Sequence, residues 1–490
     1  MEFTLSGPTL VTFIVYLVAM LAIGVIFYRL TNNLSDYVLG GRQLGPGVAA
    51  LSAGASDMSG WLLLGLPGAV YAGGMNQAWI AIGLTIGAYL NWQFVAKRLR
   101  IYTEVASDSI TVPDYLENRF ADASKALRVI SALVILLFFA FYTSSGLVAG
   151  AKLFETSFGL NYQVALWVGG LVIISYTFLG GFLAVSWTDF FQGLMMFFTL
   201  VVVPIIVINV IGGWEDTVAA VAQQEAASYN NIMSGMTLFS IVSLMAWGLG
   251  YFGQPHIITR FMAIRSAGDV PTARLIGMTW MVVGLFGAIF AGYTGIAYFA
   301  DNPLEDSEVV FMALSNELLN PWLAGVVIAA ILAAVMSTID SQLLVSSSAV
   351  AEDFYKALLR PEAGDLELVW VGRIAVAVIA LIALLLAMNP DSTVLGLVAY
   401  AWGGFGAAFG PVIILSLFWR GMSRNGAIAG IIVGAATVVI WKQLSGGMFD
   451  MYEILPGFIL CALTIVVVSK MAPPSGAVTE QFDRAARQWT

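Results

Sequence analysis

The sequence predicts an all-α polytopic membrane protein, and three observations support that prediction. Of the 490 residues, 59% are hydrophobic and 10% are charged, whereas a soluble domain carries about 25% charged residues. Apolar runs of roughly 20 residues, the length that crosses a bilayer as a helix, recur along the whole chain. Two of the runs are interrupted by glycine and polar residues. The composition leaves little room for a soluble domain, and the absence of a basic patch outside the loops excludes nucleic-acid binding.

Taken in order, the apolar runs predict 13 transmembrane helices within a single transmembrane domain, residues 1–470. The first run is too long for the apolar part of a signal peptide, and no Lys or Arg precedes Arg29. The polar tail, residues 472–490, is expected to be flexible. The predicted spans are 8–28, 48–72, 76–96, 127–150, 161–179, 188–212, 236–255, 275–299, 322–349, 368–388, 394–419, 426–443 and 453–471.

The distribution of Lys and Arg predicts the orientation of the chain. If the N-terminus lies outside, only Lys152 and Lys442 fall in outside loops, while the inside loops hold nearly all other cations, among them Arg29, Arg128 and Arg260. Cytoplasmic loops of membrane proteins are enriched in Lys and Arg. We therefore expect the N-terminus outside and the C-terminus inside. The inside loop at 97–126 is polar and is expected to form short surface helices.

The second span contains the most informative stretch, residues 52–61. It places two glycines, three serines and Asp57 where a membrane helix is normally apolar. A carboxylate there costs about 2.5–3.5 kcal/mol on insertion scales, so it normally faces a bundle interior or a water-filled cavity. Glycine and serine allow a helix to break and to release backbone carbonyls for a cation. The alternative is a small-residue packing surface with Asp57 bonded to a neighbouring helix.

A second interruption occurs in the seventh span. Residues 243–255 contain three glycines and end in Pro255. Two broken spans that lie five positions apart in span order are what two inverted five-helix repeats would produce.

The ninth span carries a cluster of hydroxyl groups. Ala334, Ser337, Thr338 and Ser341 fall on one helical face. Sodium is a hard cation that prefers several oxygen ligands. A five-oxygen cage is predicted from the carbonyls of Ala55, Met58 and Ala334 and the hydroxyls of Ser337 and Thr338. Alternatively, these hydroxyls bond back to their own helix or to neighbouring helices.

Further polar and aromatic residues lie near membrane depth. Asp189 begins the sixth span and either caps a helix or serves the ion. Asp340 follows the hydroxyl cluster and is a candidate for holding a proton or a second cation. The aromatic residues beside the polar breaks predict a small cavity with an apolar wall and a polar end: Trp61, Tyr142, Trp247 and Tyr251.

Long motifs in this sequence closely resemble the sodium/solute symporter family, in particular its bacterial members that take up proline. The motifs are Ser52 to Ala69, Gly180 to Asp189, Trp247 to His256 and Ile331 to Thr338, and the resemblance covers Leu10 to about Lys470. It implies an inverted-repeat core at 48–419, a peripheral first helix at 8–28 and two peripheral helices at 426–471. It also implies sodium-coupled symport of L-proline by alternating access across the cytoplasmic membrane of a bacterium, with no obligate protein partner.

The resemblance also implies roles for individual residues. The sodium site would comprise Ala55, Met58, Ala334, Ser337 and Thr338. The proline pocket would comprise Asp57, Gly60, Trp61, Tyr142, Trp247 and Tyr251, with Pro255 nearby. In some relatives a second sodium uses the positions of Asp189, Ser337, Asp340 and Ser341. Position 340 is an acid here, where those relatives have a hydroxyl, so the resemblance does not decide whether a second ion binds.

Other functions remain to be weighed against proline uptake. The same architecture serves for another organic substrate such as pantothenate, a sugar or another amino acid. A passive channel has no need for occluding breaks, and a membrane sensor needs an output domain that the short tail does not supply. An enzyme is not expected, because no nucleophile–base arrangement stands out. A single histidine, His256, excludes a multi-histidine metal site, and a single cysteine, Cys461, excludes an internal disulfide.

Overall fold

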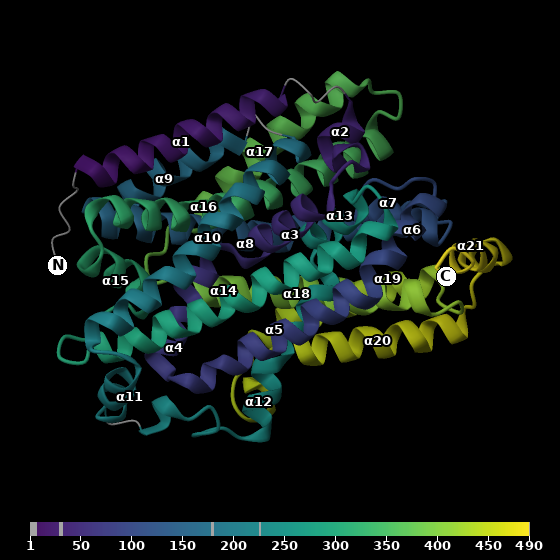
Figure 1. Ribbon diagram of the computed structural model, residues 1–490. Coiled ribbons are helices and arrows are strands. Elements are labelled where there is room, and N and C mark those ends of the chain that lie inside the picture. The colour runs from purple at the N-terminus through teal and green to yellow at the C-terminus, as the bar shows by residue number, and fades with distance from the viewer. Residues whose placement is uncertain (1–6, 29–32, 178–180, 225–226, 490) are drawn as a thin grey trace.

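The computed structural model describes residues 7–28, 33–177, 181–224 and 227–489, and Figure 1 shows them as a bundle of long helices. Within these ranges there is no β-strand, only an isolated bridge between Leu44 and Ile264. Ten of the described helical segments are long and apolar enough to cross a membrane. The prediction of an all-α polytopic membrane protein is therefore confirmed. Arg29 and Gly180, which the sequence analysis used, lie outside the described residues.

The ten spans coincide with ten of the predicted ranges. The helices that form them are α1 (Gly7–Tyr28), α5 (Ala78–Leu90) with its continuation η4 (Asn91–Ala96), α8 (Ala126–Phe158), α10 (Phe182–Ile211), α14 (Val270–Tyr298), α16 (Pro321–Ser348), α17 (Asp365–Leu386), α18 (Val394–Phe418), α19 (Arg424–Trp441) and α20 (Ile454–Met471).

The three other predicted spans fall on helical segments that are short or broken. Residues 48–72 form α3 (Pro46–Gly60), the π-helical turn η2 (Trp61–Gly65) and α4 (Leu66–Gly73). Residues 161–179 correspond to α9 (Tyr162–Thr177). Residues 236–255 form α12 (Leu238–Met245) and the 3₁₀ segment η6 (Ala246–Gly253). Such 3₁₀ and π segments inside helices mark hinges and functional sites.

The broken α3 lies in the middle of the bundle. It packs against α10, α13 (Pro255–Ala263), α14 and α16. Two of these partners are deeply enclosed, because all of α13 and every residue of α16 from Val327 to Ser348 are buried. By contrast, α1 and α20 lie at opposite edges of the bundle in Figure 1 and expose many apolar side chains. The interior therefore consists of the broken helix and its neighbours, while the edge helices are suited to face lipid.

The 3₁₀ segment η6 packs directly on α5, backbone to backbone. A Cβ atom on Gly87 would collide with the backbone of Gly248, and one on Gly83 would collide with the backbone of Met245. Glycine at these positions is what permits the close approach. The contact holds η6 against the body of the bundle next to α3.

Two expectations for the inner side of the chain are corrected by the structure. Arg260 was assigned to an inside loop, but the chain resumes as α13 after the break at Gln254, and Arg260 is fully buried within it. The tail was expected to be flexible, but residues 476–486 form α21 (Gly476–Ala486), where Asp483 pairs with Arg420 and Phe482 packs on Tyr102. The predicted short helices of the 97–126 loop are present as α6 (Lys97–Val105) and α7 (Val112–Arg119).

Candidate functional site

The break in α3 is centred on Ser59. Its φ of 44° and ψ of −169° are non-helical, although the chain is helical on both sides. In a regular helix the Trp61 N–H would bond to the carbonyl of Asp57. Here it bonds to the Ser59 hydroxyl at 3.2 Å and to the Met58 carbonyl instead. The carbonyl of Asp57 is thereby released, and it accepts a hydrogen bond from the Tyr142 hydroxyl at 3.1 Å.

Helix α16 meets α3 one turn before this break. The Ser337 hydroxyl donates to the Ala55 carbonyl at 2.8 Å and also lies 3.1 Å from the Ala334 carbonyl. The Thr338 hydroxyl lies 3.4 Å from the Ala55 carbonyl and 3.2 Å from that of Ala334. All four oxygens belong to residues that are at most 1% exposed. Four of the five oxygens of the predicted cage are therefore together.

The spacing of these oxygens suits a cation. Two ligands at right angles around a hard cation, each about 2.4 Å away, lie about 3.4 Å apart. A hydroxyl group rotates freely, so Ser337 and Thr338 are able to turn a lone pair toward an ion. Among the described residues, no group of three or more His, Cys, Asp or Glu forms a metal site. The participation of Met58 as the fifth ligand stays a prediction.

Asp57 connects the two broken segments. Its Oδ2 accepts a hydrogen bond of 2.5 Å from the Tyr251 hydroxyl on η6. Its Oδ1 is buried and has no hydrogen-bond partner among the described residues. Asp57 and Tyr251 also line a small cavity together with Met281 on α14. A buried acceptor without a partner is costly, so it marks a position where a ligand gains a hydrogen bond.

Aromatic rings lie on one side of Asp57 and Tyr251. The Trp61 and Trp247 rings lie 6.0 Å apart, and Trp247 in turn lies 5.2 Å from Tyr452. Tyr251 packs edge-on against Trp402 at 5.1 Å, and the Trp402 indole donates to the Trp247 carbonyl at 2.7 Å. Sequence analysis missed Trp402 and Tyr452, because they are distant along the chain and neither lies beside a polar break.

The remaining members of the predicted pocket have different surroundings. Gly60 is a contact point between helices, since a Cβ there would collide with Ala149 on α8 and approach Val335 on α16. Pro255 begins α13, where the chain returns to a regular helix. His256, next to it, is buried against Tyr142 with ring centroids 5.8 Å apart.

A buried ionic cluster lies beside the cage and includes three further predicted residues, Asp189, Asp340 and Ser341. Asp189 Oδ2 accepts hydrogen bonds from the Ser52 hydroxyl at 2.6 Å and from Arg260 Nη2 at 3.2 Å. The same Arg260 nitrogen donates to the Ser341 hydroxyl at 2.6 Å. Both Asp340 oxygens are buried and have no hydrogen-bond partner among the described residues. The cluster therefore contains two acids and one arginine, and only one of the acids is paired.

Known proteins match this chain over nearly its whole length. The family model described as the Sodium:solute symporter family matches residues 37–434. A sodium/proline symporter of Salmonella typhimurium and one of Escherichia coli are each 55% identical to this chain, over 98% of it and 97% of the relative. The high-affinity proline transporter PutP of Bacillus subtilis is 54% identical, over 95% of this chain and 98% of its own.

Two solved structures share the fold. A sodium-coupled sialic acid symporter, in a substrate-bound outward-open state, superposes with a TM-score of 0.82 at 19% identity, covering 96% of this chain and 99% of that one. The nucleobase–cation symporter Mhp1, in a closed conformation, superposes with a TM-score of 0.54 at 15% identity, covering 93% of this chain and 99% of its own. At these identities the comparisons show a shared fold.

The ionic cluster allows a test with two matched acids. Among the described residues, Asp189 is the one carboxylate that pairs with buried Arg260, so Asp189→Asn should cost about 3–5 kcal/mol of stability. Asp340→Asn removes a carboxylate without a partner, so it should leave stability unchanged or raise it. The measurement is thermal unfolding of the purified protein in detergent, followed by tryptophan fluorescence. Equal losses for the two variants would contradict the assignment of Arg260 to Asp189.

Proposed function

This chain belongs to the Sodium:solute symporter family, and from that premise we propose that it carries L-proline and sodium together into the cell. The observation that supports the proposal best is the contact of Ser337 and Thr338 with the Ala55 carbonyl, next to the break in α3. It combines an oxygen site for sodium with an adjoining polar and aromatic site, and both depend on the same broken helix.

We propose that the cage of Ala55, Met58, Ala334, Ser337 and Thr338 binds sodium. All five ligands are neutral, so the cage takes up a single charge without needing to lose a proton. Asp57 lies two residues beyond Ala55, and Asp189 and Asp340 add negative charge nearby. A second cation near Asp340 and Ser341 would have to share this region with the guanidinium of Arg260, which already donates to Ser341.

Proline suits the site next to the cage. It is a zwitterion with a compact apolar ring, and Trp61, Trp247 and Tyr142 provide apolar and cation–π surfaces for the ring and the ammonium group. The unpartnered Oδ1 of Asp57 is placed to accept a hydrogen bond from that ammonium group. Helix N-termini at the breaks, such as that of α13 at Pro255, favour the carboxylate. Gly60 then contributes by letting α8 and α16 pack closely beside the pocket.

Coupling follows from the shared helix. Sodium bound at Ala55 fixes the segment that carries Asp57 and Trp61, so sodium and proline raise each other's affinity by the same factor, as linkage requires. Each sodium that crosses about 100 mV contributes about 2.3 kcal/mol. A tenfold sodium gradient adds about 1.4 kcal/mol. Together they support accumulation of a few hundredfold per ion, on the order of what ~3.7 kcal/mol allows.

We further propose 13 membrane crossings with the N-terminus outside and the C-terminus inside. The ten long spans, the broken α3–α4 pair, α9 and the α12–η6–α13 segment together make 13. An odd number of crossings places the two ends of the chain on opposite sides of the membrane. This fits Figure 1, where the start of α1 and helix α21 lie at opposite ends of the bundle. The two breaks lie five crossings apart, in keeping with inverted repeats at 48–419, flanked by peripheral helices at 8–28 and 426–471. The bacterial relatives favour the cytoplasmic membrane.

The defining experiment is uptake of labelled L-proline into membrane vesicles under an inward sodium gradient. We expect uphill accumulation that collapses when the gradient is removed, because the ion supplies the driving force. Unlabelled proline should compete, whereas a sugar, pantothenate or an unrelated amino acid should not. Accumulation without sodium, or competition by one of the other solutes alone, would contradict the proposal.

The cage gives a graded prediction. Ser337→Ala and Thr338→Ala each remove one ligand oxygen, so each should raise the sodium concentration for half-maximal uptake by about tenfold or more, equivalent to ~1.4 kcal/mol. Ser347→Ala is the matched control on the same helix, because the Ser347 hydroxyl donates to the Leu344 carbonyl of its own helix. Unchanged sodium dependence in both cage variants would remove the cage from the mechanism.

Asp57 gives a sharper prediction. In Asp57→Asn the fold should be retained, because an amide oxygen still accepts from Tyr251, but sodium-driven uptake should fall by about a hundredfold or more as the negative charge is lost. Initial rates of proline uptake measure the effect, with protein in the membrane quantified in parallel. Wild-type rates in this variant would show that the charge at position 57 is not needed.

A further inference from the structure

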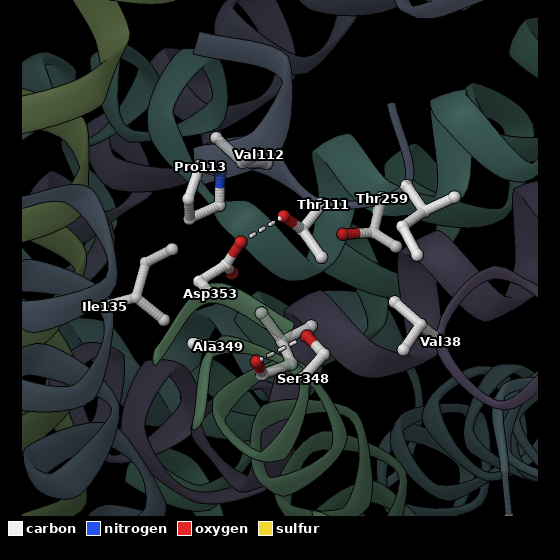
Figure 2. Close-up of a pocket in the computed structure, with 11 residues that line it drawn as sticks. Val38, Thr111, Val112, Pro113, Ile135, Thr259, Ser348, Ala349 and Asp353 are labelled. Atoms are coloured by element: carbon white, nitrogen blue, oxygen red, sulfur yellow. Dashed lines mark hydrogen bonds between the residues drawn. The ribbon is translucent and has the colours of Figure 1, made fainter. Parts of the chain in front are cut away.

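A second, smaller polar cavity lies beside the inner end of α16, and Figure 2 shows the side chains that line it. Its volume of about 10 Å³ is room for one water-sized particle. Four of its lining residues carry oxygen atoms in their side chains, and they come from four different segments of the chain: Thr111, Thr259, Ser348 and Asp353. The rest of the lining is apolar.

Asp353 is the charged group of this cavity. It is fully buried in the π-helical segment η9 (Ala349–Leu359), which continues α16. Its Oδ1 accepts a hydrogen bond from the Thr111 hydroxyl at 3.0 Å, drawn in Figure 2, and lies 3.8 Å from Arg128 Nε. Its Oδ2 is buried and has no hydrogen-bond partner among the described residues. A buried carboxylate oxygen in this condition is costly unless a ligand or ion satisfies it.

The charges around the cavity favour a cation. Arg128 forms ion pairs with Asp114, Glu117, Glu352 and Asp353. Glu352 also pairs with Lys356 at 3.1 Å. Lys125, which donates to the Ala357 carbonyl of η9, adds a third cation near Glu117. Four carboxylates and three cations leave one negative charge in this group.

The hydroxyl oxygens of Thr259 and Ser348 have lone pairs that can accept from a donor or bind an ion. The Thr259 hydroxyl donates to the Pro255 carbonyl at 2.7 Å, and the Ser348 hydroxyl donates to the Val345 carbonyl at 2.7 Å. Because each hydroxyl proton is already used within its own helix, its lone pairs are available to an ion. The donor set is one carboxylate oxygen and neutral hydroxyls, which suits a hard monovalent cation.

Helix α16 connects the cavity to the cage. Its buried hydroxyls at positions 337, 338, 341 and 348 repeat at intervals of one, three and seven residues, so they follow one face of the helix. Ser337 and Ser348 are 11 residues apart, about 16 Å along a helix. Thr259, on the other side of the cavity, precedes Arg260, which contacts Ser341 halfway along this face.

We propose that the cavity at Asp353 is a transient sodium site, which receives the ion after it leaves the cage and before it enters the cytoplasm. The proposal rests on the proposed function and on the inside position of the C-terminus. The ion is held by Asp353 Oδ2 and the oxygens of Thr111, Thr259 and Ser348. The competing explanation is an ionic clamp, in which Arg128 and its four acids only hold the inner ends of the helices together.

The two explanations predict different effects of a mutation on the sodium dependence measured from the two sides of the membrane. Asp353→Asn should raise the sodium concentration for half-maximal proline transport from the cytoplasmic side by about tenfold, since a charged ligand is lost. The corresponding concentration from the outside should change less than about twofold, because the cage is intact. Right-side-out and inside-out membrane vesicles, with sodium varied on the exposed face, measure the two values.

Two further variants complete the test. Thr259→Val removes a proposed ligand without changing charge, so it should also raise the cytoplasmic sodium concentration for half-maximal transport. If Asp353→Asn does not fold, Thr259→Val alone tests the proposal. Glu117→Gln is the matched control, since it takes an acid from Arg128 but does not line the cavity. Equal effects of Glu117→Gln and Asp353→Asn, or equal shifts on both sides, would overturn the proposal in favour of the clamp. An unchanged cytoplasmic sodium concentration for half-maximal transport in both Asp353→Asn and Thr259→Val would overturn it as well. Loss of sodium dependence in the wild-type protein would instead contradict the proposed function.

Discussion

The contact between the Ser337 hydroxyl and the Ala55 carbonyl is the interaction on which the site depends. Within a bilayer every backbone polar group needs a partner, and a broken helix releases such groups at the most unfavourable depth. The structure resolves this by placing the hydroxyls of α16 against α3 and the Tyr142 hydroxyl against the Asp57 carbonyl. The break is therefore tolerated because neighbouring helices supply the missing hydrogen-bond partners, and in the proposed function a bound sodium ion would replace some of them.

The buried charged side chains differ in how completely hydrogen bonds satisfy them. Each nitrogen of Arg260 has a hydrogen-bond acceptor, supplied by Asp189, Ser52, Ser341 and a carbonyl of its own helix. The buried acids are satisfied less fully: Asp57, Asp189 and Asp353 each keep one oxygen without a hydrogen-bond partner among the described residues, and Asp340 keeps both. Removing the ion-pair partner of a buried charge is costly for stability, and this applies to Asp189 and Arg260. For Asp57 and Asp353, which also line cavities, we propose that the open oxygen accepts from a ligand or binds an ion.

Much of this arrangement follows from the sequence, and the rest depends on long-range packing. Apolar runs located the ten long spans because bilayer thickness imposes their length, although α8 continues to Phe158 and α10 begins at Phe182, beyond the predicted ends. Glycine with serine indicated the break near Ser59. The sequence did not reveal that Arg260 is buried, because one cation after a proline is typical of an inside loop. Trp402 and Tyr452 were missed for a related reason: their approach to Trp247 and Tyr251 is set by how α18 and the segment before α20 pack.

The position of Asp57 gives the proposed sodium and proline sites a way to influence each other without touching. Ala55 and Asp57 are separated by one residue on α3, so in the proposed mechanism an ion at the Ala55 carbonyl and a solute at the Asp57 carboxylate would act on the same short segment. Tyr251 ties that carboxylate to η6, and Trp402 ties η6 to α18 through the Trp247 carbonyl. A change in the backbone at Ser59 is therefore transmitted to both broken segments together. Alternating access requires a bistable element, and in the proposed mechanism this chain of hydrogen bonds, which joins α3, η6 and α18, is the element that sodium and proline would act on.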